Sequence, residues 1–512
     1  MTDGEILLYA PKFSAYTKSK VLMAFPGPES FALSSLGYLW LFKDLDEDEE
    51  IWVKRVYSDT AQLSTNPKTV DFIAFSMSFD MDFLKVFEML EKFGIPLKKS
   101  ERGEDFPLIF AGGPVVTANP TPYEEFFDFF IIGDGEKINT EVIKSKEGRG
   151  KTEFLEYIST LDGVYVPNIT KKVKKRTKKL EEVIYTPIIS DKAFFKNTFI
   201  VEVARGCANR CGFCLASYLN LPLRCLDFDK IISALDLGLK HTKKIALLGA
   251  QLSAHPRFGD ICEYIHNRVK SGEQIEMSVS SLRVDTITPE ILEVFKACGQ
   301  KNITLAIEAG SERLRKVINK NLTREQIFKA VDIAKNAGLK GFKFYGMIGI
   351  PTEDDEDIEE LITLAKDLKS QYKGFNISFG FSTFVPKPHT PFQWCGRENS
   401  KSLEKKSRYL KKELHKIGIT ADFSGINSDY WQAVLSRGDN TLADFLIDVY
   451  KFGGKSGAFK KSAKEHNIDT DHFALQDFDL ENPLPWDFIE LNPKKDFLKQ
   501  EHDRLLNYKK NS

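Results

Sequence analysis

Apolar runs and stretches with helical spacing alternate over the first third of the chain. The apolar runs predict five strands, at residues 19–25, 51–57, 71–76, 107–111 and 129–132. Residues 82–93, between two of these runs, carry apolar side chains at the spacing of an amphipathic helix. Strands that alternate with helices favour a parallel, doubly wound α/β sheet, which we expect to occupy residues 1–145.

Glycines follow two of the predicted strands, in Gly112-Gly113 and in Gly133-Asp134-Gly135. Ligands of an open α/β sheet bind at the carboxyl ends of its strands, where these turns lie. The glycines are therefore candidates for a ligand-binding edge. Tight turns between a strand and a helix also favour glycine, so the pattern alone leaves both interpretations open.

A second series of strands and helices begins near Thr198. Its strands are predicted at residues 199–203, 244–248, 276–279, 303–307, 343–347 and 376–381. Thr288 and Thr323 mark helix starts, and Gly299 and Gly338 occupy positions typical of helix ends. These units predict a partial (β/α)6 barrel of the TIM type over residues 196–395, with its active site at the carboxyl ends of the strands. Residues 396–512 have a helical, irregular pattern and are expected to form a mainly helical region.

Residues 146–195, between the two predicted α/β units, give the weakest pattern and are expected to form a linker or hairpin. They contain a basic run at residues 171–179, KKVKKRTKK. Such a run is usually a solvated surface segment, and contact with nucleic acid is the alternative. No aromatic residue interleaves with the lysines, which disfavours single-stranded nucleic acid.

Composition narrows the class of protein. A chain of 512 residues exceeds what one hydrophobic core supports and suggests about three domains. Lys plus Arg (72) balances Asp plus Glu (73), so no overall charge directs the chain to nucleic acid or to a membrane. The N-terminus lacks a signal-peptide pattern and no apolar stretch is long enough to cross a bilayer. We therefore expect a cytoplasmic protein with neither a membrane nor a nucleic-acid partner.

Three of the seven cysteines, Cys207, Cys211 and Cys214, fall within eight residues directly after the first strand of the second series. This crowding favours metal ligation over a disulfide framework. Thiolates select iron–sulfur clusters or zinc, and a structural zinc site requires a fourth ligand. No fourth ligand is evident here, and Gly206 and Gly212 let the loop wrap a cluster. The spacing C-x3-C-x2-C therefore predicts an iron–sulfur cluster with one open iron.

These residues resemble the radical S-adenosylmethionine (radical SAM) superfamily, whose signature is C-x3-C-x2-C with an aromatic residue, here Phe213, before the last cysteine. The resemblance implies a 4Fe–4S cluster on the three cysteines and S-adenosylmethionine bound to it. It further implies an enzyme that cleaves this cofactor reductively and abstracts hydrogen from a substrate carbon. An electron donor such as flavodoxin or ferredoxin would be its partner.

The same resemblance implies contacts to S-adenosylmethionine at the ends of the following strands. Gly249-Ala250-Gln251 stands where the superfamily often has Gly-Gly-Glu, although no acid is present here. Packing or loop capping is the alternative for each residue. The full set of implied contacts is Phe213, Gly249, Gln251, Ser280, Arg283, Glu308, Gly349 and Pro351.

The whole chain also resembles an uncharacterised family in which a cobalamin-binding-like domain precedes the radical core. The matching stretches are residues 76–79, 111–114, 132–136, 384–394, 436–439 and 484–487. This resemblance implies cobalamin beside Gly112, Gly113 and Gly133. The first histidine of the chain is His241, so no histidine of the N-terminal domain can ligate cobalt. The domain therefore binds cobalamin without a protein ligand to cobalt, or is a vestigial scaffold that covers the barrel.

Cobalamin-dependent C-methylation is the reaction that these resemblances favour, for a substrate that the sequence does not identify. A radical rearrangement or C–C bond formation without cobalamin is the first alternative. A non-catalytic cobalamin or iron–sulfur sensor is the second. Methylthiolation requires a second cluster with its own three cysteines, and the remaining ones are scattered: Cys225, Cys262, Cys298 and Cys395.

Overall fold

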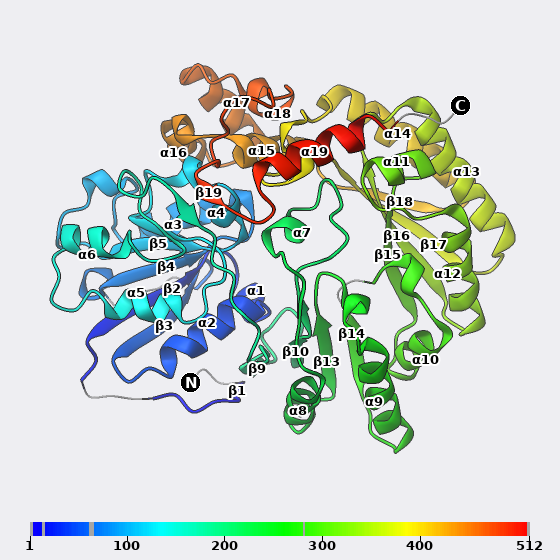
Figure 1. Cartoon of the computed structure of the whole chain (residues 1–512), viewed down its shortest axis with the longest axis horizontal. Helices are drawn as coiled ribbons and strands as arrows, with labels where there is room; N and C mark the ends of the chain where they lie inside the picture. The colour runs from blue at the N-terminus through cyan, green and yellow to red at the C-terminus, as the bar shows by residue number, and fades with distance from the viewer. Residues whose placement is uncertain (1–3, 13–15, 61–65, 280–281, 509–512) are drawn as a thin grey trace.

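Two α/β units lie side by side, and helices from the C-terminal part of the chain extend across their upper edge (Figure 1). This is a computed structural model, and it describes residues 4–12, 16–60, 66–279 and 282–508. None of the helices in these ranges is long and apolar enough to cross a membrane.

The first unit is a six-stranded sheet with strand order β3-β2-β4-β5-β6-β7, in which only β7 is antiparallel. The strand bounds are β2 Ser19–Phe25, β3 Ile51–Tyr57, β4 Phe72–Ser76, β5 Leu108–Gly112, β6 Phe129–Ile131 and β7 Val164–Tyr165. The strand order reverses between β2 and β4, which is where a doubly wound sheet opens a crevice for ligands. The predicted strands agree with these bounds to within one residue, and the doubly wound sheet is confirmed.

Both faces of this sheet are covered, which explains why its strands are apolar almost throughout. One face packs against α2 (Leu36–Asp46), α5 (Ile138–Lys144) and α6 (Lys151–Ile158). The other face packs against α3 (Phe83–Lys92). A short helix, α4 (Pro114–Ala118), follows β5 and begins at the Gly112-Gly113 turn.

The second unit contains seven parallel strands in two sheets, β10-β13-β14 and β15-β16-β17-β18. Their bounds are β10 Thr198–Glu202, β13 Lys244–Leu248, β14 Glu276–Val279, β15 Asn302–Glu308, β16 Gly341–Ile348, β17 Asn376–Thr383 and β18 Thr420–Phe423. The six predicted strands are all present. Within the described residues no strand pairing joins β14 to β15, so closure into one continuous partial barrel is not confirmed.

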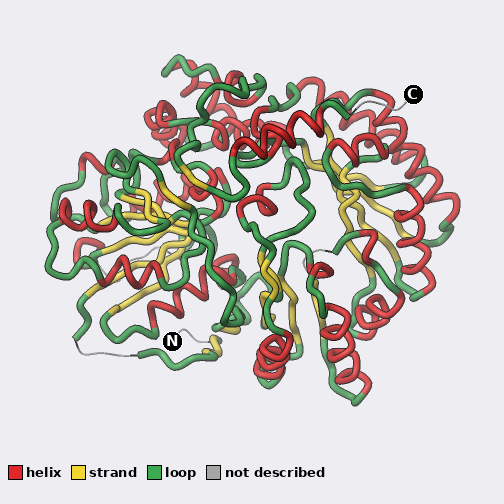
Figure 2. The backbone as a smooth tube through the Cα atoms, in the orientation of Figure 1, coloured by secondary structure: helices red, strands yellow, loops and turns green. Residues whose placement is uncertain are grey.

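Helices cover the outer face of these two sheets, as the red segments around the yellow strands show (Figure 2). They are α8 Phe228–Leu239, α9 Phe258–Lys270, α10 Pro289–Ala297, α11 Glu312–Val317, α12 Arg324–Asn336, α13 Asp355–Gln371 and α14 Ser400–Lys416. The predicted helix boundaries are confirmed. Thr288 and Thr323 cap α10 and α12 through their side chains, and Gly299 and Gly338 have the positive φ of helix ends.

The C-terminal region is mainly helical, as predicted, and packs on the N-terminal sheet rather than standing apart. Its helices are α15 Ile426–Arg437, α16 Ala443–Lys451, α17 Ser456–Glu465, α18 Thr470–Ala474 and α19 Lys495–Leu506. Phe459 of α17 contacts Phe83 of α3, with ring centroids 6.3 Å apart. A short strand, β19 (Ile489–Glu490), pairs with β8 (Val173–Lys174) of the basic run. The run therefore belongs to the contact between the first unit and the C-terminal region.

Candidate active site

The three cysteines lie on a loop that begins after β11 (Ala204–Arg205) and ends at α7 (Leu215–Leu219). We call residues 206–214 the cluster loop. Gly206 at its start has a φ of +91°, and a Cβ there would lie 2.3 Å from the backbone oxygen of Asn220. Only glycine tolerates both conditions, so this position is fixed by backbone geometry.

The cysteine side chains are largely shielded from water, with Cys207 and Cys211 buried and Cys214 half-buried. Burial raises the pKa of the Cys211 thiol to about 12, and the nearby ammonium of Lys320 opposes that rise. Among the described residues, no group of three or more His, Cys, Asp or Glu side chains already stands at metal-ligand spacing. The fit to an iron–sulfur cluster therefore rests on the donor set, three thiols of one glycine-bounded loop.

Gln251 lies against the cluster loop, just beyond the carboxyl end of β13. Its Oε1 accepts a hydrogen bond from the side-chain amide of Asn209, and the Cys207 thiol donates to the same oxygen at 3.5 Å. Gly249 lies two residues earlier, and a Cβ there would be 3.2 Å from the backbone oxygen of Ala204. Gln251 thus contacts the cluster loop itself, and Gly249 lies beside β11, which precedes that loop.

Arg283 and Glu308 approach the same loop from the next two strand ends. Glu308 accepts an ion-paired hydrogen bond from Lys320 at 2.8 Å. Arg283 pairs with Asp285 at 2.9 Å and donates to the backbone oxygen of Lys320 at 2.9 Å. Burial opposes the charge of Arg283, but Asp285 and, more weakly, the thiols of the cluster loop raise its pKa. The ends of β13, β14 and β15 therefore converge on the cysteines.

Three residues that sequence reasoning missed complete this surrounding: Asn209, Asn319 and Lys320. The side-chain amide of Asn319 donates to the backbone oxygens of Asn209 and Arg210, at 3.1 and 3.0 Å. Asn319 and Asn321 both have positive φ, a conformation that asparagine tolerates better than most residues. The Asn-Lys-Asn sequence directly after α11 was the signal that could have marked this turn.

Four other residues were predicted to contact S-adenosylmethionine: Phe213, Ser280, Gly349 and Pro351. Phe213 packs against an apolar cluster that includes Met347 and Ile350. The amide of Gly349 donates to the carboxylate of Glu353 at 2.7 Å, and a Cβ at Gly349 would lie 2.7 Å from Leu403. These contacts give the loop of Gly349 and Pro351 a packing role, and its contact with S-adenosylmethionine stays a prediction. Ser280 lies outside the described residues.

A cavity of about 560 Å³ lies between the two α/β units, next to the cluster loop. We call it the interdomain cavity. From the first unit it is lined by α2 and by the glycine turns at Gly113 and Gly133, and from the second by Gly206 and Gly249. Gly112 does not line it. The turns that sequence analysis selected for cobalamin thus share one cavity with the start of the cluster loop.

The missing side chains of Gly113 and Gly133 do not themselves create that cavity. Gly113 has a φ of +113°, and its Cβ would lie 2.4 Å from the backbone oxygen of Met77. Gly133 has a φ of +106°, and its Cβ would lie 2.2 Å from the backbone oxygen of Arg176. Both glycines are required for tight turns, so a substitution at either position disturbs the backbone before it reaches a ligand.

Arg205, directly before the cluster loop, ties the Gly133-Asp134-Gly135-Glu136 turn to the second unit. It pairs with Asp134 at 2.9 Å and with Glu136 and Glu202 at 2.8 Å. Arg224 adds a second pair to Asp134 at 2.6 Å. Burial opposes ionisation of Asp134, but the two guanidinium groups hold its pKa below the usual range. The acidic residues of this turn therefore serve to dock it beside the cysteines.

Two other motif stretches, residues 384–394 after β17 and residues 484–487 of the C-terminal region, meet each other and the first unit, and we call these contacts the joint. Lys387 pairs with Asp80 at 2.7 Å. His389 is buried, and its Nε2 lies 2.9 Å from the backbone oxygen of Ala118. The indole of Trp486 donates to the side-chain oxygen of Gln393 at 2.7 Å. Residues 384–394 and 484–487 thus have partners inside the protein, and these partners make them structural.

The other cysteines do not form a second cluster site. Cys262, Cys298 and Cys395 are buried and Cys225 is half-buried. Cys262 lies in α9 and Cys298 ends α10, both within the helical layer, whereas Cys395 directly follows residues 384–394 of the joint. Their placement in different parts of the fold agrees with the expectation that methylthiolation, which needs a second three-cysteine site, is not the reaction.

A loop with three cysteines at the carboxyl ends of parallel strands, beside a doubly wound sheet, is the arrangement expected of an iron–sulfur protein. The model of the radical SAM superfamily matches residues 201–365, and that of the N-terminal region of radical SAM proteins matches residues 37–167. The chain belongs to the radical SAM superfamily. It is therefore an enzyme whose cofactors are a 4Fe–4S cluster and S-adenosylmethionine, and it requires a reductant.

Curated relatives share much of the chain. An uncharacterized protein of Methanocaldococcus jannaschii is 34% identical over 388 residues, which are 74% of this chain and 80% of that protein. The threonylcarbamoyladenosine tRNA methylthiotransferase MtaB of Aquifex aeolicus is 25% identical over 265 residues, 50% of this chain and 62% of that protein.

Two solved structures share the two-unit arrangement. The cobalamin-dependent S-adenosylmethionine radical enzyme OxsB, with aqua-cobalamin and S-adenosylmethionine bound, aligns over 88% of this chain and 72% of its own (TM-score 0.56, 15% identity). The radical S-adenosylmethionine methyltransferase TsrM from Kitasatospora setae, with cobalamin and a [4Fe-4S] cluster bound, aligns over 89% of this chain and 100% of its own (TM-score 0.52, 12% identity). At these identities the likeness concerns the fold.

Proposed function

We propose that this radical SAM enzyme binds cobalamin in the interdomain cavity and methylates a substrate carbon. The observation that carries the proposal is the composition of that cavity. Its walls combine the strand ends of the doubly wound sheet with Gly206, the first residue of the cluster loop, and with Gly249, which follows β13. A corrin in this position lies between the two units, at the edge where doubly wound sheets bind their ligands. The cobalamin-bound structures with the same fold support this assignment.

When bound, the cofactors supply a radical from S-adenosylmethionine and a methyl group from methylcobalamin, and the protein supplies position and exclusion of water. Cys207, Cys211 and Cys214 are the proposed cluster ligands. Gln251 contacts the Cys207 thiol, and Arg283 and Glu308 place charged groups near the cysteines. Trp40 and Leu41 of α2 give the interdomain cavity an apolar wall. Elsewhere around the cavity, the ion pairs of Arg205 with Asp134 and Glu136 hold the turn after β6 beside the cluster loop.

No histidine precedes His241, so we propose that cobalt has no ligand from the N-terminal domain. The cobalt(II) form should then give an electron paramagnetic resonance spectrum without nitrogen splitting. We further propose a small flavodoxin-type or ferredoxin-type protein as the electron donor, since the enzyme requires a reductant.

The test uses a glycine whose substitution fills the cavity without strain. Gly37 lines the interdomain cavity, is the second residue of α2, and has no atom within 4 Å of a built Cβ. Gly37→Trp should abolish corrin retention while reconstituted protein still forms 5′-deoxyadenosine. Gly457→Trp is the matched control, because Gly457 is the second residue of α17 and is equally open.

Corrin content is measured from the absorption spectrum after incubation with hydroxocobalamin and desalting. Corrin bound by Gly457→Trp but not by Gly37→Trp supports the proposal. Equal retention in both variants, or no retention by the natural protein, overturns it. Formation of 5′-deoxyadenosine without any corrin would leave a cobalamin-independent radical reaction as the function. Absence of 5′-deoxyadenosine from protein with a full cluster would favour the sensor.

A further inference from the structure

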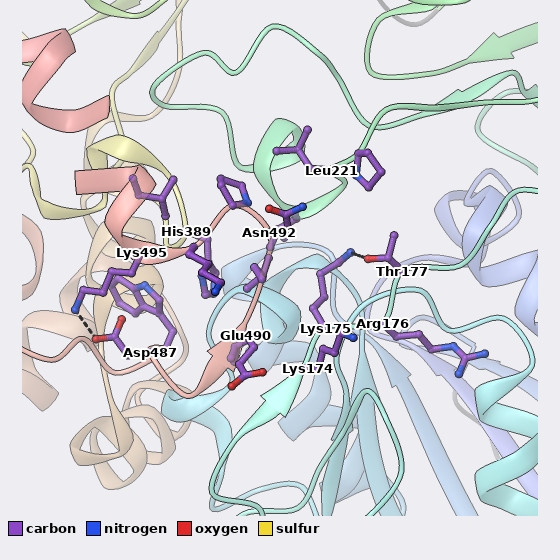
Figure 3. Close-up of a pocket in the computed structure, with 18 of the residues that line it drawn as sticks. Lys174, Lys175, Arg176, Thr177, Leu221, His389, Asp487, Glu490, Asn492 and Lys495 are labelled. Atoms are coloured by element: carbon purple, nitrogen blue, oxygen red, sulfur yellow. Dashed lines mark hydrogen bonds and ion pairs between the residues drawn. The ribbon is translucent and has the colours of Figure 1, made fainter. Parts of the chain in front are cut away.

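A second and larger cavity, of about 930 Å³, lies on the other side of Lys175 from the interdomain cavity. Figure 3 shows its walls: the basic run on one side, and Asp487 and Lys495 of the C-terminal region on the other. We call it the basic cavity. Lys175 and Leu219 line both cavities, so the two spaces meet at these side chains.

The basic run contributes five consecutive residues to this cavity, Lys174 to Lys178. They are held there because β8 pairs with β19, which returns from the C-terminal region. Lys175 is the most enclosed of them, with 7% of its surface exposed, and its ammonium donates to the hydroxyl of Thr177 at 2.7 Å. Burial of a charged lysine without an ion pair is costly, so an anion that entered the cavity would stabilise the protonated form of Lys175.

Three acidic residues also line the cavity, Asp162, Asp487 and Glu490, but among the described residues none forms an ion pair with Lys174 or Lys175. Within the described residues, the ion pairs of the run involve only Lys172, 4.0 Å from Glu490, and Lys178, 3.8 Å from Glu182. Asp487, on the opposite wall, is already paired with Lys495 at 2.6 Å. The ammonium groups of Lys174 and Lys175 are therefore without an ion pair among the described residues, whereas the side chain of Arg176 points away from the cavity (Figure 3). Apolar side chains complete the cavity: Leu219, Leu221, Pro222, Trp486, Ile489 and Leu498.

We propose that the basic cavity binds a small molecule with a phosphate group, which Lys174 and Lys175 hold while its apolar part lies against Leu221 and Pro222. That this ligand is the substrate rests on the proposed function. Because the two cavities meet at Lys175 and Leu219, a ligand anchored by its phosphate can extend toward the interdomain cavity. Phosphate is the chemistry that a concave site with several ammonium groups recognises.

Two other ligands that carry phosphate groups, cobalamin and RNA, have to be distinguished from a small molecule. Cobalamin carries a phosphodiester in its nucleotide tail, which could reach this wall from the interdomain cavity. An RNA phosphate is disfavoured, because Lys175 is buried and the basic run lacks interleaved aromatic residues for stacking. The small molecule is therefore the occupant for which we argue.

The experiment labels lysines of the cobalamin-free protein with pyridoxal 5′-phosphate, an aldehyde that carries a phosphate. The lysine amine adds to the aldehyde carbon and water leaves, and borohydride then reduces the imine to a stable secondary amine. Burial lowers the pKa of Lys175 to about 8, although Asp134 opposes this shift, so a large fraction of the amine is unprotonated at pH 8. Peptide mapping by mass spectrometry should find Lys175 labelled about tenfold faster than Lys171 or Lys179.

Inorganic pyrophosphate should protect Lys175 from pyridoxal 5′-phosphate. Pyridoxal, which lacks the phosphate, should label Lys175 with a smaller preference, the part that its lowered pKa alone provides, and pyrophosphate should not change that part. Lys174→Gln should raise the pyrophosphate concentration needed for protection about tenfold. Lys171→Gln is the matched control, because Lys171 belongs to the same run but does not line the cavity, and it should leave protection unchanged.

Each of three outcomes would overturn the proposal: no preference for Lys175, no protection by pyrophosphate, or protection by RNA alone. Protection by cobalamin and not by pyrophosphate would assign the wall to the corrin tail instead. The measurement needs neither bound corrin nor turnover. Loss of corrin binding in the natural protein would therefore refute the proposed function while leaving the phosphate site intact. Corrin binding without protection of Lys175 by pyrophosphate would refute the phosphate site while leaving the proposed function intact.

Discussion

The cluster loop and the joint both coincide with sequence motifs, but they differ in how strongly their side chains are bound to partners inside the protein. In the joint, Lys387, His389 and Trp486 each have a close polar partner within the protein. In the cluster loop, the thiols form only the weak hydrogen bonds that sulfur makes, as with Cys207, which donates to Gln251 at 3.5 Å and accepts from Asn209 at 3.4 Å. A motif whose residues are already partnered stabilises the fold, whereas a motif with unused ligating atoms is available for a cofactor.

The strongest test of this comparison removes the unused ligands one at a time. Cys207→Ala, Cys211→Ala and Cys214→Ala should each abolish cluster incorporation and reduce 5′-deoxyadenosine formation to background, since each removes one of three thiolate ligands. Iron and sulfide analysis after anaerobic reconstitution measures the first effect, and chromatography of the reaction products measures the second.

Cys298→Ala is the control, because that thiol is equally buried but ends a helix in the outer layer. It should retain its full iron content. If all four variants lost iron equally, the assignment of the cluster loop would be wrong. If none of the three loop variants lost iron, the loop would be structural, like the joint.

The second prediction concerns a partnered residue of the joint, His389, and the dependence of stability on pH. Burial lowers the pKa of His389 to about 3, although the contact with the Ala118 oxygen opposes this shift. The unfolded chain binds a proton near pH 6.5 that the folded protein excludes, so stability falls as pH drops through the window from 6.5 to 3. Between pH 7.5 and pH 5, this group should cost about 2 kcal/mol of unfolding free energy.

Urea unfolding of the cofactor-free protein at the two pH values, followed by tryptophan fluorescence, measures this change. His389→Gln should reduce the loss by about 2 kcal/mol, because the amide has no proton to gain. His241→Gln, at an exposed position, should leave the loss unchanged. An identical pH dependence in all three proteins would show that His389 is not held neutral by the joint, and the contrast with the cluster loop would fail.

Sequence patterns predicted the strands well and drew attention to the cysteines, because both signals are local. A buried parallel strand is an apolar run, and three thiols in eight residues need no knowledge of the fold. The basic run was interpreted as a solvated segment because its environment is supplied by β19, more than 300 residues away in sequence. The strand β18 was missed because Thr420–Phe423 is short and acquires its conformation from pairing with β17.

Residues around the cysteines were predicted only in part, for a related reason. Gln251, Arg283 and Glu308 lie near strand ends, so the alternation of strands and helices marked them. Lys320 lies in a turn after α11, and only the fold brings its ammonium to Glu308. The gap between β14 and β15 was also unforeseen, since each strand is regular by itself and pairing is not encoded in its periodicity.

The smallest expected effect concerns Asn319, in the turn after α11, which contacts the cluster loop. Asn319 donates two hydrogen bonds to backbone oxygens of the cluster loop and has a φ of +58°. Asn319→Gly keeps the backbone conformation but removes both donors, which should cost about 1 to 2 kcal/mol of loop order. The cluster should still assemble, and iron should pass to a chelator about 5- to 30-fold faster.

Asn467→Gly is the control, because Asn467 has a φ of +52° and lies in the C-terminal region. If the two variants released iron at the same rate, the contacts of Asn319 would not order the cluster loop. If Asn319→Gly failed to fold, this turn would belong with the fully partnered residues of the joint, because its bonds would then serve the fold rather than the cofactor.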